Sequence, residues 1–328
     1  MLSSCYICVP FNEVIPLEQE SKHIEKPKSK ASAKIADYRT FLKVRLASLV
    51  VFSAAITFAL AFHHDGNLMK MPFDWSKLFW VVLGGFLVTG SSNGLNQIWE
   101  RNSDKLMTRT AGRPLPQKRM NTTEGLIIAA ITGIVGVYIL WHYLNFMTGM
   151  LGLLSLVLYA SIYTPMKKVS SWAVFVGAFP GAMPPMIGWV AYTGELSPEA
   201  LSLFALQFIW QFPHFWAIAW RCHEDYQKAG FHLLPSAGGK DRKSAMQMLV
   251  YTLFMIPISL LPTVNLFGKI GGAFSAVVFI LSALLMLYPA YKLFKTLEDK
   301  WATKLMFASF IYLPVVLIAL LIDQLFIL

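Results

Sequence analysis

Long apolar runs, separated by short polar stretches, make up most of the chain after residue 40. Each run has roughly 17 to 25 residues, enough for a helix to cross about 30 Å of hydrocarbon. Helices are expected over nine ranges, namely 41–62, 78–99, 124–142, 146–163, 171–192, 200–220, 246–263, 270–291 and 304–325. The pattern therefore predicts an all-α integral membrane protein with nine transmembrane helices in one bundle.

Composition and charge agree with a membrane protein and add an orientation. The 328 residues are 56% hydrophobic and 14% charged, whereas a soluble domain has about 25% charged residues. If nine spans alternate, 25 of the 28 Lys and Arg residues fall on the side of the N-terminus, and the exceptions are Lys70, Lys77 and Lys269. Because basic residues gather on the cytoplasmic side, the N-terminus is predicted to be cytoplasmic. Topology thus accounts for the net charge of +10, and no nucleic-acid partner is expected.

The first 35 residues are expected to form a disordered cytoplasmic arm, followed by one polytopic domain over residues 36–328. The arm has no apolar core of the kind found in a signal peptide, and its four glutamates are atypical of a transit peptide. Cys5 and Cys8 form a CxxC without the surrounding pattern of a redox domain. These features favour a bacterial plasma (inner) membrane over the mitochondrial inner membrane.

A polar stripe leaves the second apolar run. Asn96, Glu100 and Asp104 are four residues apart and so share one helical face. Their oxygens suit Mg²⁺, and Arg109 and Arg113 follow with guanidinium groups that can bind phosphate oxygens. Ordinary interfacial charges are the alternative, but Asn96 lies within the apolar run, where a polar group is costly. The stretch predicts a metal-bound diphosphate at the membrane surface.

The stretch over residues 208–235 repeats this arrangement. Trp210, His214, Arg221 and Asp225 recur on one helical face that leads out of the sixth apolar run. Asp225 and Glu224 are expected to supply a second set of metal ligands facing the first. A satisfied buried histidine and a functional one both fit the position of His214.

Two further observations bear on the predicted site. The sequence YTPMKK at residues 163–168 adds Lys167 and Lys168 on the same side of the membrane. The chain has no HExxH motif and no Cys/His set with zinc spacing, so a zinc site is not expected.

The pattern NxxxExxxDxxMxRTxxRPLP, from Asn96 to Pro116, resembles the first aspartate-rich motif of the UbiA superfamily of intramembrane prenyltransferases, which have nine transmembrane helices. Within that superfamily the chain is most similar to the protoheme IX farnesyltransferases, or heme O synthases. The runs that carry this similarity are YTPMKK (163–168), GAFPGAMPPMIGW (177–189), FIWQFPHFWAIAW (208–220) and DYQKAGFHLLP (225–235). The chain departs from the usual pattern by having Glu100 and Asn102 in place of aspartates and Lys168 in place of arginine.

The resemblance implies a Mg²⁺-dependent transfer of the farnesyl group of farnesyl diphosphate to a vinyl group of heme b, giving heme O and diphosphate. It implies that the metal ligands are Asn96, Glu100, Asp104, Glu224 and Asp225. The residues expected to stabilise the diphosphate are Arg109, Arg113, Lys167 and Lys168. Those expected to bind substrate are Tyr163, Trp210, His214, Arg221 and Tyr226.

Two rival functions remain at this point. A quinone precursor or a chlorophyll-like ring would be an alternative acceptor for the same class of enzyme. An anion transporter would require interrupted spans in two repeated halves, and the sequence shows no such symmetry. Whether a downstream heme A synthase or terminal oxidase is a partner is left open.

Overall fold

The computed structural model describes residues 30–64 and 72–326. The CxxC and most of the arm predicted over residues 1–35 lie outside the described residues. The end of that predicted arm is helical, because helix α1 (Lys30–Phe41) begins before residue 35.

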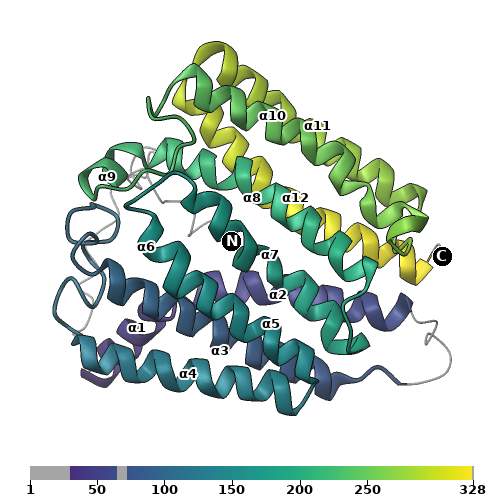
Figure 1. Ribbon diagram of the computed structural model, residues 1–328, viewed down its shortest axis with the longest axis horizontal. Coiled ribbons are helices and arrows are strands. Elements are labelled where there is room, and N and C mark those ends of the chain that lie inside the picture. Colours follow the sequence, from purple (N-terminus) through teal and green to yellow (C-terminus); the bar gives the residue numbers. More distant parts are fainter. Residues whose placement is uncertain (1–29, 65–71, 327–328) are drawn as a thin grey trace, which may run out of the picture.

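Helices account for most of the described chain. The long ones are α2 (Val44–His64), α3 (Trp75–Glu100), α4 (Thr122–His142), α5 (Phe146–Val157), α7 (Ala173–Thr193), α8 (Pro198–Arg221), α10 (Arg242–Ser259), α11 (Ala273–Thr296) and α12 (Asp299–Phe326). The short ones are α6 (Thr164–Met166), α9 (His223–Lys228), a π-helical turn over Leu158–Tyr163 and two 3₁₀ turns over Leu261–Thr263 and Asn265–Phe267. Figure 1 shows α10 and α11 at one edge of the bundle and α4 at the opposite edge, with α2, α7 and α8 between them.

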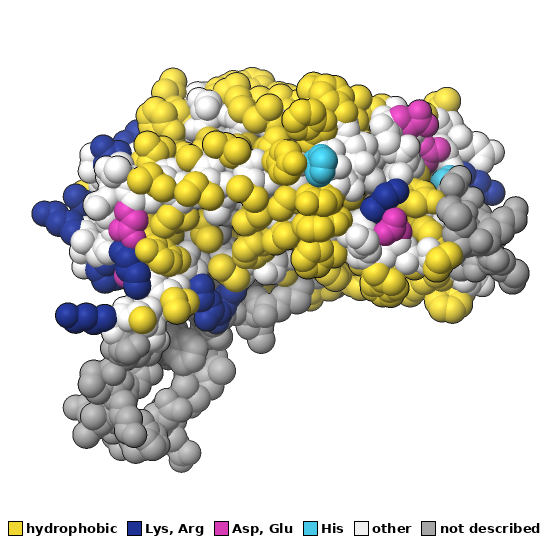
Figure 2. All heavy atoms as spheres, turned by 90° about the horizontal axis from the view of Figure 1, so that it is seen from below, with side chains coloured by type: hydrophobic (Ala, Val, Ile, Leu, Met, Phe, Trp, Pro, Cys, Tyr) yellow, Lys and Arg dark blue, Asp and Glu magenta, His cyan; other side chains and the backbone are white. Residues whose placement is uncertain are grey.

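The described residues contain eight helices that are long and apolar enough to cross a membrane, one fewer than predicted. The predicted range 200–220 does form a helix, α8, but α8 is not among the eight. Its buried polar side chains Gln207, Gln211 and His214 lower its hydropathy. Figure 2 shows hydrophobic side chains across the middle of one face and charged ones toward its two ends. The protein is thus an all-helical membrane protein.

Side-chain caps set where several helices begin. Asp74, Asn121, Asn145, Ser197 and Asp241 each accept a hydrogen bond from a backbone N–H in the first turn of the helix that follows. Such caps satisfy donors that a helix leaves unpaired at its start. They place the starts of α3, α4, α5, α8 and α10 within a few residues of the predicted ranges.

Helix α7 lies at the centre of the bundle and packs closely on α2. A Cβ at Gly188 would overlap the carbonyl oxygen of Ala54, so only glycine permits this approach. Pro184 and Pro185 also lie inside α7 without breaking it. This close packing places α7 beside α2 and α8, and the three helices border a common cavity.

Candidate functional site

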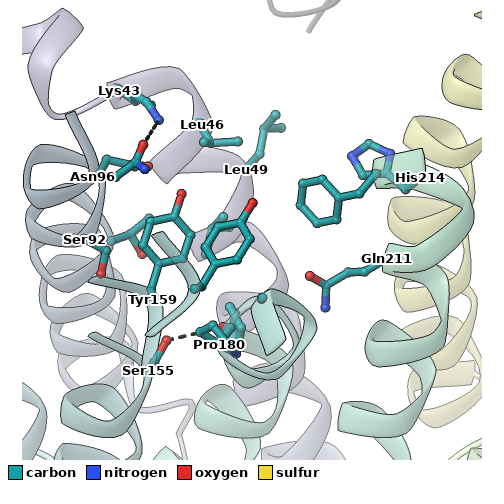
Figure 3. Close-up of a pocket in the computed structure, with 18 of the residues that line it drawn as sticks. Lys43, Leu46, Leu49, Ser92, Asn96, Ser155, Tyr159, Pro180, Gln211 and His214 are labelled. Carbon is teal, nitrogen blue, oxygen red and sulfur yellow. Dashed lines mark hydrogen bonds between the residues drawn. The ribbon is translucent and has the colours of Figure 1, made fainter. Parts of the chain in front are cut away.

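A cavity of about 400 Å³ opens between α2, α3, α7, α8 and α12. This volume lies in the range of about 300–1,000 Å³ that is typical of ligand pockets. Figure 3 shows Lys43, Asn96 and Tyr159 on one side of the cavity and Gln211 and His214 on the other. The cavity thus has a charged end beside α3 and an aromatic wall formed by α8 and α12.

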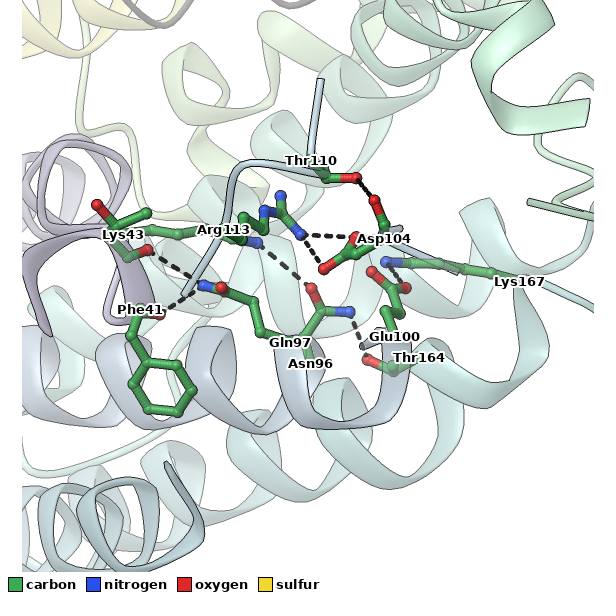
Figure 4. Close-up of polar contacts among 11 residues, drawn as sticks. Phe41, Lys43, Asn96, Gln97, Glu100, Asp104, Thr110, Arg113, Thr164 and Lys167 are labelled. Carbon is green, nitrogen blue, oxygen red and sulfur yellow. Dashed lines mark hydrogen bonds and ion pairs between the residues drawn. The ribbon is translucent and has the colours of Figure 1, made fainter. Parts of the chain in front are cut away.

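The predicted polar stripe lies at the charged end and its side chains are buried, but α3 ends at Glu100, so Asp104 lies in the turn after the helix and not on the same helical face. Asn96, Glu100 and Asp104 are 1%, 6% and 0% exposed. Lys167 Nζ lies 2.8 Å from Glu100 Oε1, and Arg113 Nη1 lies 3.0 and 2.8 Å from the two carboxylate oxygens of Asp104 (Figure 4). The acidic and basic residues predicted from the sequence therefore come together as two buried ion pairs.

Lys43 also belongs to this cluster, although it was not predicted from the sequence. It lies just before α2, where its φ of 49° places the backbone in the left-handed region. Its Nζ donates to Asn96 Oδ1 at 3.3 Å. Burial, together with the nearby charges of Arg113 and Lys167, holds the pKa of Lys43 well below its usual range. The sequence does place a lysine at the start of the first apolar run, but this position was attributed only to the cytoplasmic excess of basic residues.

The π-helical turn brings two tyrosines to the cavity. Tyr159 and Tyr163 both line it, with ring centroids 5.1 Å apart. Thr164 Oγ1 donates to the carbonyl oxygen of Tyr159 at 2.8 Å, and Lys167 Nζ lies 4.5 Å from the centroid of the Tyr163 ring. Such π-helical turns are frequent at functional sites. Tyr163 was predicted, whereas Tyr159, one turn earlier, was missed.

Asp225 reaches the loop after α3 and not the cavity itself. Its carboxylate accepts hydrogen bonds from the backbone N–H groups of Thr108 at 3.4 Å and Arg109 at 3.3 Å. Burial alone would raise the pKa of Asp225, but these N–H groups and Lys228 lower it overall. Arg109 lines the cavity, with its guanidinium carbon 5.9 Å from the ring centroid of Tyr226, which also lines it.

Asp104 is not among the lining residues, and three other predicted residues do not line the cavity either. Lys168 and Glu224 are exposed on the surface. Arg221 Nη1 lies 3.8 Å from Asp299 at the start of α12, and Arg221 is not a lining residue. Position along a helical face or in a loop does not determine which way these side chains turn.

The aromatic wall contains two of the three predicted residues of α8. Trp210 and His214 line the cavity with their rings stacked, at a centroid distance of 4.5 Å and an interplanar angle of 15°. His214 Nδ1 lies 2.8 Å from Ser309 Oγ on α12, and Trp210 Nε1 donates to the carbonyl oxygen of Ser309 at 2.9 Å. Phe310 meets the His214 ring edge to face, at 4.9 Å.

The oxygen donors at the charged end fit a magnesium ion that takes few ligands from the protein. Within residues 30–64 and 72–326, no three His, Cys, Asp or Glu side chains are grouped closely enough to share a metal. Mg²⁺ is commonly bound by one or two carboxylates together with water and substrate phosphates. Glu100 and the amide of Asn96, which line the cavity, match that donor set when a diphosphate supplies the remaining oxygens. Asp104 is fully buried and binds Arg113 through both carboxylate oxygens, so it is not placed among the metal ligands.

Comparison with known proteins agrees with this geometry. The sequence model of the UbiA prenyltransferase family matches residues 50–311. A protoheme IX farnesyltransferase from Cytophaga hutchinsonii is 46% identical over 88% of this chain and 98% of its own length. One from Flavobacterium johnsoniae is 42% identical over 88% of this chain and 94% of its own length.

Solved structures show the same fold. A structure reported for digeranylgeranylglyceryl phosphate synthase superposes with a TM-score of 0.72 at 19% identity, covering 89% of this chain and 99% of that one. A UbiA homolog from Archaeoglobus fulgidus, solved with DMAPP and Mg²⁺ bound, gives a TM-score of 0.61 at 13% identity and covers 87% and 99%. The chain belongs to the UbiA prenyltransferase family and, within it, to the protoheme IX farnesyltransferases.

Proposed function

We propose that this protein transfers the farnesyl group of farnesyl diphosphate to a vinyl group of heme b, giving heme O and diphosphate. The relatives that are 42–46% identical over 88% of the chain support this reaction. The observation that carries the proposal is the division of the cavity. Four basic side chains, of which Lys167 is buried, line one end (Lys43, Arg109, Arg113 and Lys167), and an aromatic wall faces them across the space.

The charged end suits the departure of diphosphate. When the bond between C1 of the farnesyl group and the diphosphate oxygen breaks, negative charge develops on the leaving group. Arg113 and Lys167 are already oriented by Asp104 and Glu100, and Lys43 and Arg109 complete the cluster. Fixed charges of this kind stabilise a transition state without having to reorganise during the reaction.

Magnesium belongs to the same end of the cavity in this proposal. Asn96 and Glu100 would hold it together with the diphosphate oxygens, while Asp104 orients Arg113. The ion would neutralise charge on the diphosphate as a Lewis acid. The Mg²⁺ bound in the Archaeoglobus fulgidus homolog supports the assignment.

The acceptor step takes place against the aromatic surfaces. The vinyl group attacks C1 of the allylic cation, water adds to the cation that results, and one proton is released to solvent. One water is therefore consumed for each heme O and diphosphate formed. Tyr159, Tyr163 and Trp210 line the cavity and offer π faces that stabilise a cation.

Several residues predicted as ligands have other places in the proposed site. Asp225 holds the backbone that carries Arg109, and so positions that cation without binding metal. Lys168, Arg221 and Glu224 are left out, because none of them lines the cavity.

We also propose that α8 is the ninth membrane span and that the N-terminus is cytoplasmic. The distribution of 25 of 28 basic residues supports both assignments, and they place the charged end of the cavity at the cytoplasmic face. The bacterial relatives support a plasma membrane location.

Purified protein supplied with farnesyl diphosphate and either heme b or 4-hydroxybenzoate tests the reaction. We expect heme O from the first pair and no prenylated product from the second, as measured by mass spectrometry of the extracted acceptors. A prenylated benzoate in the absence of heme O would overturn the proposal in favour of a quinone-forming enzyme.

A further inference from the structure

We infer that His214 is the axial ligand of the heme iron, which it binds through Nε2 while the porphyrin is the farnesyl acceptor. This inference rests on the proposed function and adds to it a mode of acceptor binding. It is carried by the hydrogen bonds that fix the imidazole ring.

The hydrogen bonds of Ser309 determine which imidazole nitrogen of His214 carries the proton. The Ser309 hydroxyl donates its single proton to the backbone carbonyl oxygen of Met306 at 2.6 Å. With the hydroxyl in that orientation, Ser309 Oγ accepts a hydrogen bond from His214 Nδ1, which lies 2.8 Å away. In the neutral imidazole the proton thus sits on Nδ1, and Nε2 carries a free lone pair.

The Nε2 atom of His214 is accessible from the cavity. Among the described residues His214 Nε2 has no hydrogen-bond partner, yet it is not one of the unpartnered atoms sealed from solvent. His214 is only 6% exposed, and it is the sole histidine that lines the described cavity. The small exposed surface of Nε2 is therefore available to a ligand in the cavity.

Three neighbouring side chains fix the orientation of the His214 imidazole ring. The imidazole is stacked on Trp210 and met edge to face by Phe310, while Ser309 fixes its rotation. A histidine that binds a metal usually donates its other N–H to a fixed acceptor, and histidine is a common axial ligand of heme iron. His214 has both features, because Ser309 is the acceptor for Nδ1–H and Nε2 is left to bind iron.

Axial ligation would hold the porphyrin at the α8–α12 wall. The charged end lies across the cavity, so a vinyl group at the porphyrin edge can face the farnesyl C1 atom (Figure 3). Iron, and not only the flat ring, would then contribute to recognition of the acceptor.

Titration of the purified full-length protein with ferric heme b and with metal-free protoporphyrin IX tests this role. In His214→Ala we expect heme affinity to fall about 10–100-fold, with loss of the Soret and EPR signature of imidazole ligation, whereas affinity for the metal-free ring stays within about twofold. Added imidazole should restore the signature. The exposed His142→Ala variant is the matched control and should keep the wild-type spectrum.

Ser309→Ala provides a second variant that leaves the imidazole in place. Loss of its acceptor should weaken heme binding and shift the spectrum, again without affecting the metal-free ring. Equal weakening of both porphyrins in His214→Ala, or an unchanged heme spectrum, would overturn the inference. Failure of the proposed function is a separate result, namely that the wild-type protein makes no heme O.

Discussion

Lys167 and Lys168 are neighbours that the sequence could not tell apart. Both follow the fourth apolar run, and both were expected to contact the diphosphate. The structure separates them, because the Lys167 ammonium is buried against Glu100, while Lys168 is exposed. Adjacent residues near a helix end point in different directions, and no pattern in the sequence indicates which of the two faces the site.

Lys167→Met is expected to lower kcat/KM for farnesyl diphosphate about 100-fold or more, as when one fixed charge is removed from a transition state. The same substitution at Lys168 should leave kcat/KM within about twofold of wild type. Steady-state assays of heme O formation measure both. Because Lys167→Met also leaves Glu100 unpaired, the double variant Lys167→Met/Glu100→Gln controls for lost stability. Equal losses at the two lysines would contradict the assigned site.

Asp104 and Asn102 form a second contrasting pair. Asp104 is fully buried and holds Arg113 through both oxygens. Asn102, which stands where an aspartate is usual, is exposed and does not line the cavity. Its missing charge therefore has little bearing on the site.

Asp104→Asn should reduce heme O formation about 100-fold, because Arg113 loses the carboxylate that orients it. Asn102→Asp should leave the Mg²⁺ concentration needed for half-maximal rate unchanged. Rates measured across a Mg²⁺ titration test both expectations. If restoring aspartate at position 102 lowered the Mg²⁺ requirement, residue 102 would belong to the metal site after all.

At the scale of elements, each predicted apolar run corresponds to a helix, and the differences lie at the ends. The first run was expected over 41–62, but the positive φ of Lys43 separates α1 from α2. The run expected over 146–163 ends in the π-helical turn. Hydrophobic periodicity locates helices well, whereas a local change of backbone geometry depends on tertiary contacts such as that between Thr164 and Asn96.

Helix α7 carries three prolines, and for two of them, Pro184 and Pro185, other helices satisfy the carbonyl groups that are left unpaired. Pro185 has no N–H to donate to Gly181, and Pro184 has none for Pro180. Gln207 Nε2 donates to the Gly181 oxygen at 2.6 Å, and Ser155 Oγ donates to the Pro180 oxygen at 3.3 Å. Helices α5 and α8 are thereby joined to α7 on two sides of the cavity.

Gln207→Leu is expected to lower the free energy of unfolding by about 1–3 kcal/mol, because the Gly181 carbonyl loses its donor. Adding Pro185→Ala should recover part of this loss, since an alanine at that position restores a backbone N–H to the same oxygen. Thermal unfolding of the purified variants in detergent measures the effect. Additive destabilisation in the double variant would show that the two groups do not share this acceptor.

At the scale of the whole molecule, the spacing of acidic and basic motifs predicted that distant segments converge on one site. The structure confirms that residues of α3, its following loop and the 163–168 segment surround one cavity. Lys43, Tyr159 and Ser309 were not predicted. The partners of Lys43 and Ser309 lie far along the chain, whereas Tyr159 lies one helical turn before Tyr163 and that spacing was the available signal.

The topology predicts opposite locations for two exposed lysines, Lys118 after α3 and Lys269 before α11. In a chain without its native cysteines, Lys118→Cys should react with an impermeant thiol reagent only from the cytoplasmic side. Lys269→Cys should react only from the other side. Labelling of both from the same side would mean that α8 does not cross the membrane, because one fewer crossing reverses the location of residue 269.

The central claim is that farnesyl diphosphate and heme b meet in one cavity, with the diphosphate at the charged end and the porphyrin on the α8–α12 wall. A cryo-EM structure of the protein with heme b, Mg²⁺ and an unreactive thio-analogue of farnesyl diphosphate tests it most directly. We predict diphosphate density beside Arg113 and Lys167, with the heme iron next to His214. Heme density outside this cavity, or a diphosphate at the opposite end, would contradict the account.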